Sequence, residues 1–425
     1  MTFQQFDFHP AIAKAIAGCG YTTPTAIQQR AMPHLLAGKD LLGLAQTGTG
    51  KTAAFVLPTL QNLQPGTRKT VRTLILTPTR ELAEQVHENI RQMAGKTGLK
   101  SCAIYGGVSK NGQIHTLRRG VELVVACPGR LLDHLNSRTI DLRNVEVLIL
   151  DEADQMFDKG FLPDIRRILK YIPKKRQSMV FSATMPAAIR HLVEEILTDH
   201  VTIQVDYEKP MHTIKHVLFQ VAQNRKTALL KNILQQKDMA TTLIFTRTKY
   251  KAKNLARQLQ NAGYRATSLQ GNMSQNQRKT AMNGFKAGKF NILVATDIAA
   301  RGIDVSGISH VVNYDIPDTV EAYTHRTGRT GRAQQTGEAL TFVTADDGRL
   351  LQAVERRLEQ KIRREIIADF DSGFDQSVAG SGNRRKSSAA RRSGRRKPMG
   401  RSAKGTTRRK NASPSHRRRT GATQQ

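Results

Sequence analysis

The sequence predicts an α/β fold with two tandem domains, each built around a parallel sheet, and a disordered basic tail. Three observations predict it: apolar strands alternate with amphipathic helices, this alternation occurs twice at one spacing, and residues 376–425 are rich in Lys and Arg. The 425 residues exceed one ordinary domain and suit two. We expect domains at residues 1–205 and 217–370, a connection over 206–216 and a tail over 371–425.

Continuous apolar strands followed by helices are typical of parallel sheets that are covered on both faces. Residues 74–77, Leu-Ile-Leu-Thr, have this pattern, and an amphipathic helix follows over about 81–93. Residues 243–246, Leu-Ile-Phe-Thr, repeat it, with a helix over about 249–260. The sequence therefore predicts the same strand–helix unit in each half of the chain.

The two halves share a spacing. The strands that begin at Leu74 and Leu243 lie 169 residues apart, as do Val124 and Leu293 in the next matching pair. This favours two similar domains, although chance is an alternative because α/β strands resemble one another. We place the join near residues 206–216, where Tyr-Glu-Lys-Pro-Met interrupts the pattern.

A glycine-rich loop follows the apolar strand at residues 40–44 and opens a helix. Glycines let backbone N–H groups turn toward a phosphate, Lys51 adds charge for the β and γ phosphates, and the Thr52 hydroxyl can ligate Mg²⁺. An ordinary strand-to-helix turn is the alternative, but the order of strand, Gly-Lys-Thr and helix favours a phosphate loop. The loop is Ala45, Gln46, Thr47, Gly48, Thr49, Gly50, Lys51 and Thr52.

Carboxylates follow the apolar run at residues 145–150. At the end of a buried strand, Asp151 can hold Mg²⁺ through water, and Glu152 can orient and deprotonate an attacking water. An acidic cluster alone is more often a helix N-terminus or a solvated turn. Together with the phosphate loop, it favours hydrolysis of a nucleoside triphosphate.

Arginines recur every third residue in His325–Arg332. Arg326 and Arg329 suit the charge that develops on a transferred phosphoryl group, whereas an RNA-binding loop is the alternative, more so for Arg332. Since they lie in the second domain, the ATP site would be complete only when the domains close. Ser182-Ala183-Thr184 also follows a strand, and its hydroxyls either link this site to the cleft or cap a helix.

Taken in order and spacing, these motifs resemble the DEAD-box ATP-dependent RNA helicases over about residues 1–370, and the tail is most similar to that of bacterial RhlE-type members. The resemblance implies two RecA-like domains, ATP and Mg²⁺ as cofactors, and local, non-processive unwinding of short RNA duplexes or remodelling of ribonucleoprotein. Residues 20–28 match the family's Q motif, which implies that Gln28 reads the adenine edge and Phe3 stacks on its ring.

The resemblance also assigns residues beyond the phosphate loop and the carboxylates. It implies that Asp304 lies at the ribose and phosphates, that Arg326 and Arg329 are arginine fingers, and that Ser182, Thr184 and His325 couple the sites. Cys127 stands where the family usually has Thr and so lacks a hydroxyl, whereas Thr324 in place of Val is expected to be tolerated. The implied RNA contacts are Pro78, Thr79, Arg80, Gly107, Arg130, Gly271, Arg278 and Thr296.

The net charge of +33 favours nucleic acid over an acidic membrane as partner. Residues 376–425 hold 16 of the basic residues and no Asp or Glu, which leaves +17 on residues 1–375. We expect this tail to tether RNA electrostatically, with a solubilising extension as the alternative. Contacts to the RNA backbone would make binding largely sequence-independent. With no Trp and 5% aromatic residues, base-stacking platforms should be scarce.

Other features limit the location and the class of the protein. Three cysteines without a Cys-x-x-Cys pair, no secretory signal and no apolar run of about 20 residues favour the cytoplasm and no membrane span. Without sustained heptads we expect a monomer, with ribosomal or RNA-degradation proteins as partners. Two alternatives stay open: a DNA-directed motor, and an ATP-gated RNA clamp or annealing scaffold.

Overall fold

The computed structural model describes residues 2–46, 48–205, 214–236, 239–300, 307–331 and 337–374, all within one compact unit, Met1–Gln376. Several expectations fall outside the described residues. These are the roles of Thr47 and Asp304, the basic loop at Arg332, most of the connection, 206–213, and nearly all of the tail, from residue 375 onward.

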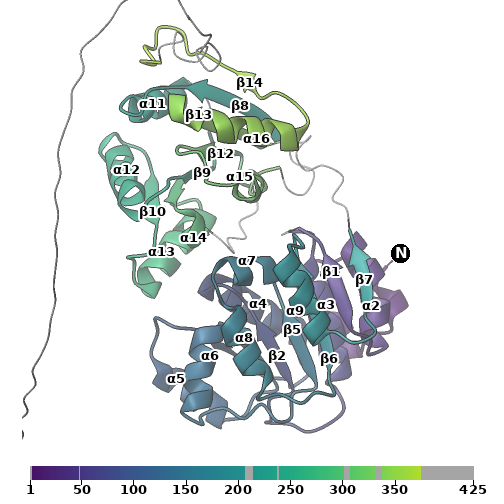
Figure 1. Ribbon diagram of the computed structural model, residues 1–425. Helices are drawn as coiled ribbons and strands as arrows, with labels where there is room; N and C mark the ends of the chain where they lie inside the picture. Colours follow the sequence, from purple (N-terminus) through teal and green to yellow (C-terminus); the bar gives the residue numbers. More distant parts are fainter. Residues whose placement is uncertain are drawn as a thin grey trace, which may run out of the picture. The chain divides into compact units, whose positions relative to one another are not determined.

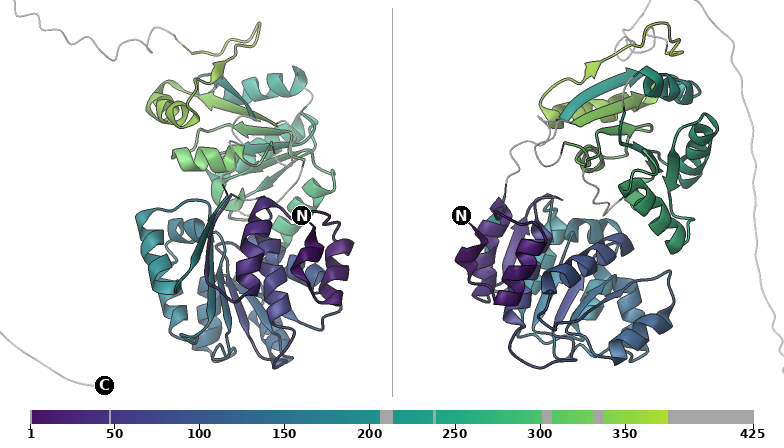
Figure 2. Two further views of the ribbon diagram at one scale, coloured as in Figure 1. Left: turned by 90° about the vertical axis from the view of Figure 1, so that its right-hand side faces the viewer. Right: turned by 180° about the vertical axis from the view of Figure 1, so that it is seen from behind.

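The first sheet has seven parallel strands in the order β3-β4-β2-β5-β6-β1-β7. Figure 1 labels β2, β5, β6, β1 and β7 of this sheet. Helices cover both of its faces (Figure 2), α1 to α4 on one core and α6 to α9 on the other. The strands are β1 (Leu41–Leu44), β2 (Thr73–Leu76), β3 (Ser101–Ile104), β4 (Leu123–Ala126), β5 (Val147–Leu150), β6 (Gln177–Ser182) and β7 (Val201–Gln204). The helices are η1 (Phe3–Phe6), α1 (Pro10–Gly18), α2 (Ala26–Leu36), α3 (Lys51–Asn62), α4 (Arg80–Ala94), α5 (Lys110–Arg118), α6 (Pro128–Asn136), α7 (Ala153–Asp158), α8 (Leu162–Leu169) and α9 (Ala187–Ile196).

The second sheet also has seven parallel strands, in the order β10-β11-β9-β12-β13-β8-β14. Its cores lie under α11 and α12 on one face and under α13 to α16 on the other. The strands are β8 (Ile214–Gln220), β9 (Thr242–Phe245), β10 (Ala266–Leu269), β11 (Ile292–Ala295), β12 (His310–Asn313), β13 (Gly337–Val343) and β14 (Arg363–Arg364). The helices are α11 (Lys226–Gln236), α12 (Lys249–Asn261), α13 (Gln275–Lys286), α14 (Asp297–Ala300), α15 (Val320–Thr327), η2 (Ala345–Asp347) and α16 (Gly348–Leu358).

The two sheets have the same strand order, position by position, which confirms the predicted duplication. The strands that predicted it, β2 with β9 and β4 with β11, hold equivalent places, and each pair begins 169 residues apart. One boundary differs from the expectation. Because β8 begins at Ile214 and pairs with Gly337 of β13, residues 214–216 belong to the second sheet rather than to the connection.

A buried aspartate organises the second sheet beyond the end of β12. Asp315 is 2% exposed and accepts hydrogen bonds from Lys226 Nζ at 3.3 Å, from Lys251 Nζ at 3.2 Å and from the Arg247 N–H at 3.0 Å. Burial opposes ionisation of Asp315, but the Arg247 N–H and the two ammonium groups outweigh it and hold its pKa below the usual range. This carboxylate therefore stabilises the fold in its ionised form.

Replacing Asp315 with asparagine is expected to lower the free energy of unfolding by about 3 kcal/mol at pH 7, because Lys226 would be left buried without its counter-ion. A carboxyl with a lowered folded pKa contributes stability above its unfolded pKa of 3.8 and loses it as the pH falls through the folded value. The difference between wild type and variant in urea unfolding should thus be constant from pH 7 to pH 5 and shrink below about pH 4. Asp141→Asn, at an exposed ion pair, is the control and should change little.

Candidate functional site

The phosphate loop joins the end of β1 to the start of α3. Gly48 and Gly50 have φ near +90°, and a Cβ on Gly50 would lie 2.6 Å from Gln28 Nε2, so the turn requires glycine. Lys51 is 6% exposed, and its Nζ donates to the carbonyl of Ala45 at 2.8 Å. The loop thus folds around its own lysine, whose ammonium a phosphate oxygen could take over. Thr52 follows it, half-buried in the first turn of α3.

The expected adenine contacts lie beside this loop or near the N-terminus. Gln28 is 4% exposed; its Oε1 accepts from the Thr25 N–H at 2.9 Å, and its Nε2 donates to the Gly50 carbonyl at 3.1 Å. The Phe3 ring is nearly buried and packs 6.2 Å from the ring of Tyr21. The structure therefore ties Gln28 directly to the turn of the phosphate loop.

The carboxylates follow β5 at the same edge of the sheet. Asp151 is 3% exposed, and none of the described residues donates a hydrogen bond to its Oδ1. Burial raises the pKa of Asp151 well above its usual range, although the Lys51 ammonium lowers it. Glu152, also buried, has φ of +56° at the N-terminus of α7. A buried oxygen without a donor suits a hard divalent cation.

Sequence reasoning assigned no role to Asp154, which links the carboxylates to the Ser-Ala-Thr motif at the end of β6. Its Oδ2 accepts from the N–H groups of Ala183 and Thr184 at 3.2 and 3.0 Å and from Thr184 Oγ1 at 3.1 Å. Ser182 Oγ accepts from the Asp154 N–H at 3.3 Å and donates to the Thr184 carbonyl at 2.7 Å. Neither hydroxyl caps the following helix α9, which begins at Ala187 with Pro186 as its N-cap, but Ser182 Oγ does accept from an N–H in the first turn of α7.

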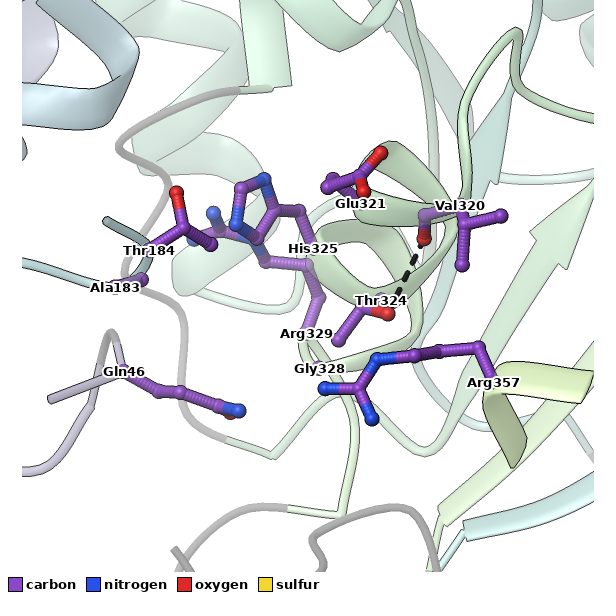
Figure 3. A pocket seen from close by; sticks show the side chains of 10 residues that line it. All are labelled: Gln46, Ala183, Thr184, Val320, Glu321, Thr324, His325, Gly328, Arg329 and Arg357. Atoms are coloured by element: carbon purple, nitrogen blue, oxygen red, sulfur yellow. Dashed lines mark hydrogen bonds between the residues drawn. The ribbon is translucent and has the colours of Figure 1, made fainter. Parts of the chain in front are cut away.

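A cavity of about 210 Å³ brings the Ser-Ala-Thr motif and the phosphate loop together with the arginine motif (Figure 3). His325 and Arg329 point toward Thr184 in this view, and Gln46 lies on the opposite side from Glu321. Arg357 of α16 also points into the cavity, and no sequence motif indicated it. The lining comprises Gln46, Ala183, Thr184, Val320, Glu321, Thr324, His325, Gly328, Arg329 and Arg357.

Arg326 lies elsewhere. It is 2% exposed, and its Nε and Nη2 donate to the Asp297 carboxylate at 2.5 and 2.6 Å. Its Nη1 donates to the Asp315 carbonyl at 2.7 Å and to Asn313 Oδ1 at 3.2 Å, and the guanidinium lies 5.0 Å from the centre of the Phe245 ring. In this arrangement the expected arginine finger holds the second sheet together and would have to leave these partners to contact a phosphate.

A second cavity, of about 550 Å³, gathers seven of the eight expected RNA contacts. Gly107 lies just outside; its φ is +81°, and a Cβ there would overlap the Arg80 guanidinium. The lining is strongly cationic, and Glu81 is the single carboxylate that the described residues contribute to it. The expected residues that line it are Pro78, Thr79, Arg80, Arg130, Gly271, Arg278 and Thr296, with Gly106, Cys127, Gly129, Lys159, Phe161, Arg247, Lys249, Met273 and Ala299 completing it.

Glu81 belongs to the motif of the expected RNA contacts, but the sequence assigned it no role of its own. Its Oε1 pairs with Arg278 Nη2 at 2.6 Å, and the neighbouring Glu84 pairs with Lys279 at the same distance. Arg278 also donates to the carbonyls of Gln270 and Ala299 at 3.3 Å. The Arg278 guanidinium is therefore largely occupied by protein acceptors, and a phosphate would compete with Glu81 for it.

Cys127 lines this cavity in the place of the usual threonine. Burial raises the pKa of its thiol to about 11, although a hydrogen bond with Thr77 opposes the shift. The thiol is thus neutral at pH 7, and it makes no capping hydrogen bond at the start of α6. The missing hydroxyl is not replaced by a charged group.

The remaining expectations concern metals, membranes and disulfides. Within the described ranges, no three His, Cys, Asp or Glu side chains gather as a metal cluster, and all three cysteines are free. No described helix combines the length and apolar character that a membrane span requires.

Comparisons with known proteins agree with this arrangement. Two family profiles match: "DEAD/DEAH box helicase" over residues 25–192 and "Helicase conserved C-terminal domain" over residues 225–334. The chain is 40% identical over 377 residues to the DEAD-box ATP-dependent RNA helicase CshA of Bacillus subtilis, covering 88% of this chain and 76% of that protein. It is 42% identical over 363 residues to the ATP-dependent RNA helicase DeaD of Buchnera aphidicola, covering 85% and 60%. The structure of S. cerevisiae Dbp5 bound to RNA and ADP BeF3 matches with a TM-score of 0.77 and 29% identity, over 86% of this chain and 95% of that chain.

Proposed function

The chain belongs to the DEAD-box ATP-dependent RNA helicases, and from this premise we propose that it couples RNA-stimulated ATP hydrolysis to local, non-processive unwinding of short RNA duplexes or remodelling of ribonucleoprotein. Its two sheets are tandem RecA-like domains. One observation carries the proposal: residues of the phosphate loop, the Ser-Ala-Thr motif and the arginine motif line a single cavity. ATP hydrolysis and RNA binding can thus both depend on closure of the cleft between the two domains.

The residues divide the chemistry as follows. Lys51 neutralises the β and γ phosphates, Glu152 orients and deprotonates the attacking water, and Arg329 offsets the charge that develops on the transferred phosphoryl group. Thr52 and, through water, Asp151 would hold Mg²⁺, which neutralises charge on the phosphates when bound. The donor-free Asp151 Oδ1 supports this assignment. Phe3 and Gln28 would bind the adenine.

Asp154 would transmit a change at the nucleotide site, such as the loss of phosphate, to the cleft between the two domains. Its carboxylate holds both Ala183 and Thr184, and Thr184 lines the cavity together with His325. A shift of the carboxylates when phosphate leaves would therefore move the wall that the second domain contacts. This supports the coupling role that we propose for Ser182, Thr184 and His325.

The test is steady-state ATPase with Mg²⁺, measured without nucleic acid, with RNA and with matched DNA. Strong stimulation by RNA alone is the expected result. Equal stimulation by DNA would favour a DNA-directed motor, and no turnover in folded protein would leave the ATP-gated clamp or annealing scaffold. A duplex-release assay then separates unwinding from ATP-gated binding.

The tail, residues 376–425, is proposed as an electrostatic RNA tether. Deleting it should weaken RNA affinity and raise the RNA concentration for half-maximal ATPase, most strongly at low salt, because each neutralised phosphate releases a counter-ion. The measurement is RNA binding and ATPase at two or more salt concentrations. If neither changes at low salt, the tail is a solubilising extension.

Finer assignments are also proposals. The basic tail supports the RhlE-type subgroup, while the relatives named above are CshA and DeaD proteins. The division into domains at 1–205 and 217–370 is supported by the two sheets, with the second starting at Ile214. Free cysteines support the cytoplasm, and we propose a monomer whose partners are RNA and ribosomal or RNA-degradation proteins.

A further inference from the structure

The most exposed aromatic side chain among the described residues is Tyr250, with 66% of its surface accessible. It is the second residue of α12, which begins at the carboxyl-end edge of the second sheet just after β9. No site assigned above uses it. A single exposed aromatic residue is ordinary on a protein surface, so its meaning depends on its surroundings.

A cavity of about 580 Å³ lies against Tyr250, between the start of α12, the end of β10 and the first turns of α13. Its wall combines hydroxyls and carboxamides with an apolar patch that includes Phe290 and Ala281. Within the described part of the chain, the carboxamides of Asn272 and Asn276 make no hydrogen bond to another residue. Such amides both donate and accept and can meet the edge of any base. The wall thus suits a flat group with a polar edge.

The charge of this surface is cationic. Lys249 Nζ lies 5.3 Å from the centre of the Tyr250 ring, and Lys253 lies one turn further along α12. Among the residues that the structure describes, no carboxylate lines the cavity. Lys249 and Met273 also line the cavity of the expected RNA contacts, so the two cavities adjoin. A strand bound in one could therefore extend into the other past Lys249.

We propose that Tyr250, Lys249, Lys253 and this cavity form a nucleobase subsite, in which one unstacked base of the bound RNA stacks on the Tyr250 ring. Every base offers a π face, so the contact adds affinity without requiring one sequence. Lys253 neutralises the phosphate of that nucleotide, and Asn272 and Asn276 meet the base edge. The inference rests on the proposed function, since it needs an RNA strand in the adjoining cavity. One stacking platform exists despite the low aromatic content.

The test uses the full chain with a non-hydrolysable ATP analogue and a set of single-stranded RNAs, each carrying one abasic nucleotide at a different position. Fluorescence anisotropy measures the affinity. Tyr250→Ala should weaken binding of intact RNA about tenfold, and Tyr250→Phe should retain it, because the ring rather than the hydroxyl makes the contact. For wild type, one abasic position should cost a similar factor, and Tyr250→Ala should be insensitive there.

Controls separate this inference from the proposed function. Tyr171, 46% exposed in the first domain, lines neither cavity, and Tyr171→Ala should bind like wild type. The inference is overturned if Tyr250→Ala binds every RNA like wild type, or if Tyr250→Phe loses as much affinity as Tyr250→Ala. The proposed function has a separate test, RNA-stimulated ATPase of the wild type. If RNA does not stimulate turnover, the proposed function fails, whatever the Tyr250 variants show.

Discussion

Replacing Glu152 with glutamine is expected to lower kcat for RNA-stimulated ATP hydrolysis by about 10²- to 10⁴-fold, because the amide cannot accept the proton of the attacking water. The substitution keeps the shape of a buried side chain at the N-terminus of α7, so ATP-dependent RNA binding should persist. Steady-state ATPase and RNA anisotropy with ATP measure the two effects. Glu88→Gln, at an exposed pair with Arg91, is the control and should leave both unchanged.

The same variant separates the two functions that the sequence left open. A helicase should lose repeated rounds of duplex release, since each round ends with hydrolysis. Release that continues over many cycles without turnover would instead identify an ATP-gated clamp or annealing scaffold. Loss of ATP-dependent RNA binding as well would contradict the assignment of Glu152 as the base.

Replacing Arg326 with alanine is expected to lower the free energy of unfolding by about 3–5 kcal/mol, because it removes a nearly buried guanidinium from the Asp297 carboxylate. Arg326→Lys should recover little of this, since an ammonium cannot bind the carboxylate with two parallel hydrogen bonds. Urea unfolding measures the loss. Arg357→Ala, an exposed position on the cavity of Figure 3, is the stability control.

Arg329 should behave differently because it lines the cavity with the phosphate loop. Arg329→Ala is expected to lower kcat by about 10³-fold or more. Wild-type stability in Arg326→Ala, together with lost turnover, would show that Arg326 acts on the phosphate after all. Comparing both variants by unfolding and ATPase distinguishes the two roles.

The repeated strand spacing predicted the fold because it depends on residues that are close in sequence. The pattern of hydrophobic residues alone revealed β2, β9 and the 169-residue offset. This hydrophobic pattern does not predict contacts between residues that lie far apart in the sequence. Asp154 meets residues 182–184 at the end of another strand, and Arg278 meets Glu81, which lies 197 residues earlier. No local pattern encodes such pairs.

The two arginines show a similar limit. Arg326 and Arg329 lie three residues apart in one repeating motif, so the sequence predicted the same role for both. However, Arg326 lies inside α15, which ends at Thr327, whereas Arg329 lies beyond it. The end of the helix therefore turns one side chain into the core and the other into the cavity. The amino-acid composition likewise gives the number of aromatic residues but does not indicate that the Tyr250 side chain is exposed.

The ion pair between Lys226 and Asp315 bears on how many ATP molecules each chain can bind. In the duplicated order, β8 corresponds to β1 and β12 to β5. Lys226 begins the helix after β8, as Lys51 begins the helix after β1, and Asp315 follows β12 as Asp151 follows β5. In the second copy this lysine and this aspartate neutralise each other at 3.3 Å. We therefore expect no second triphosphate site at this place in the second sheet, and one ATP bound per chain in each cycle.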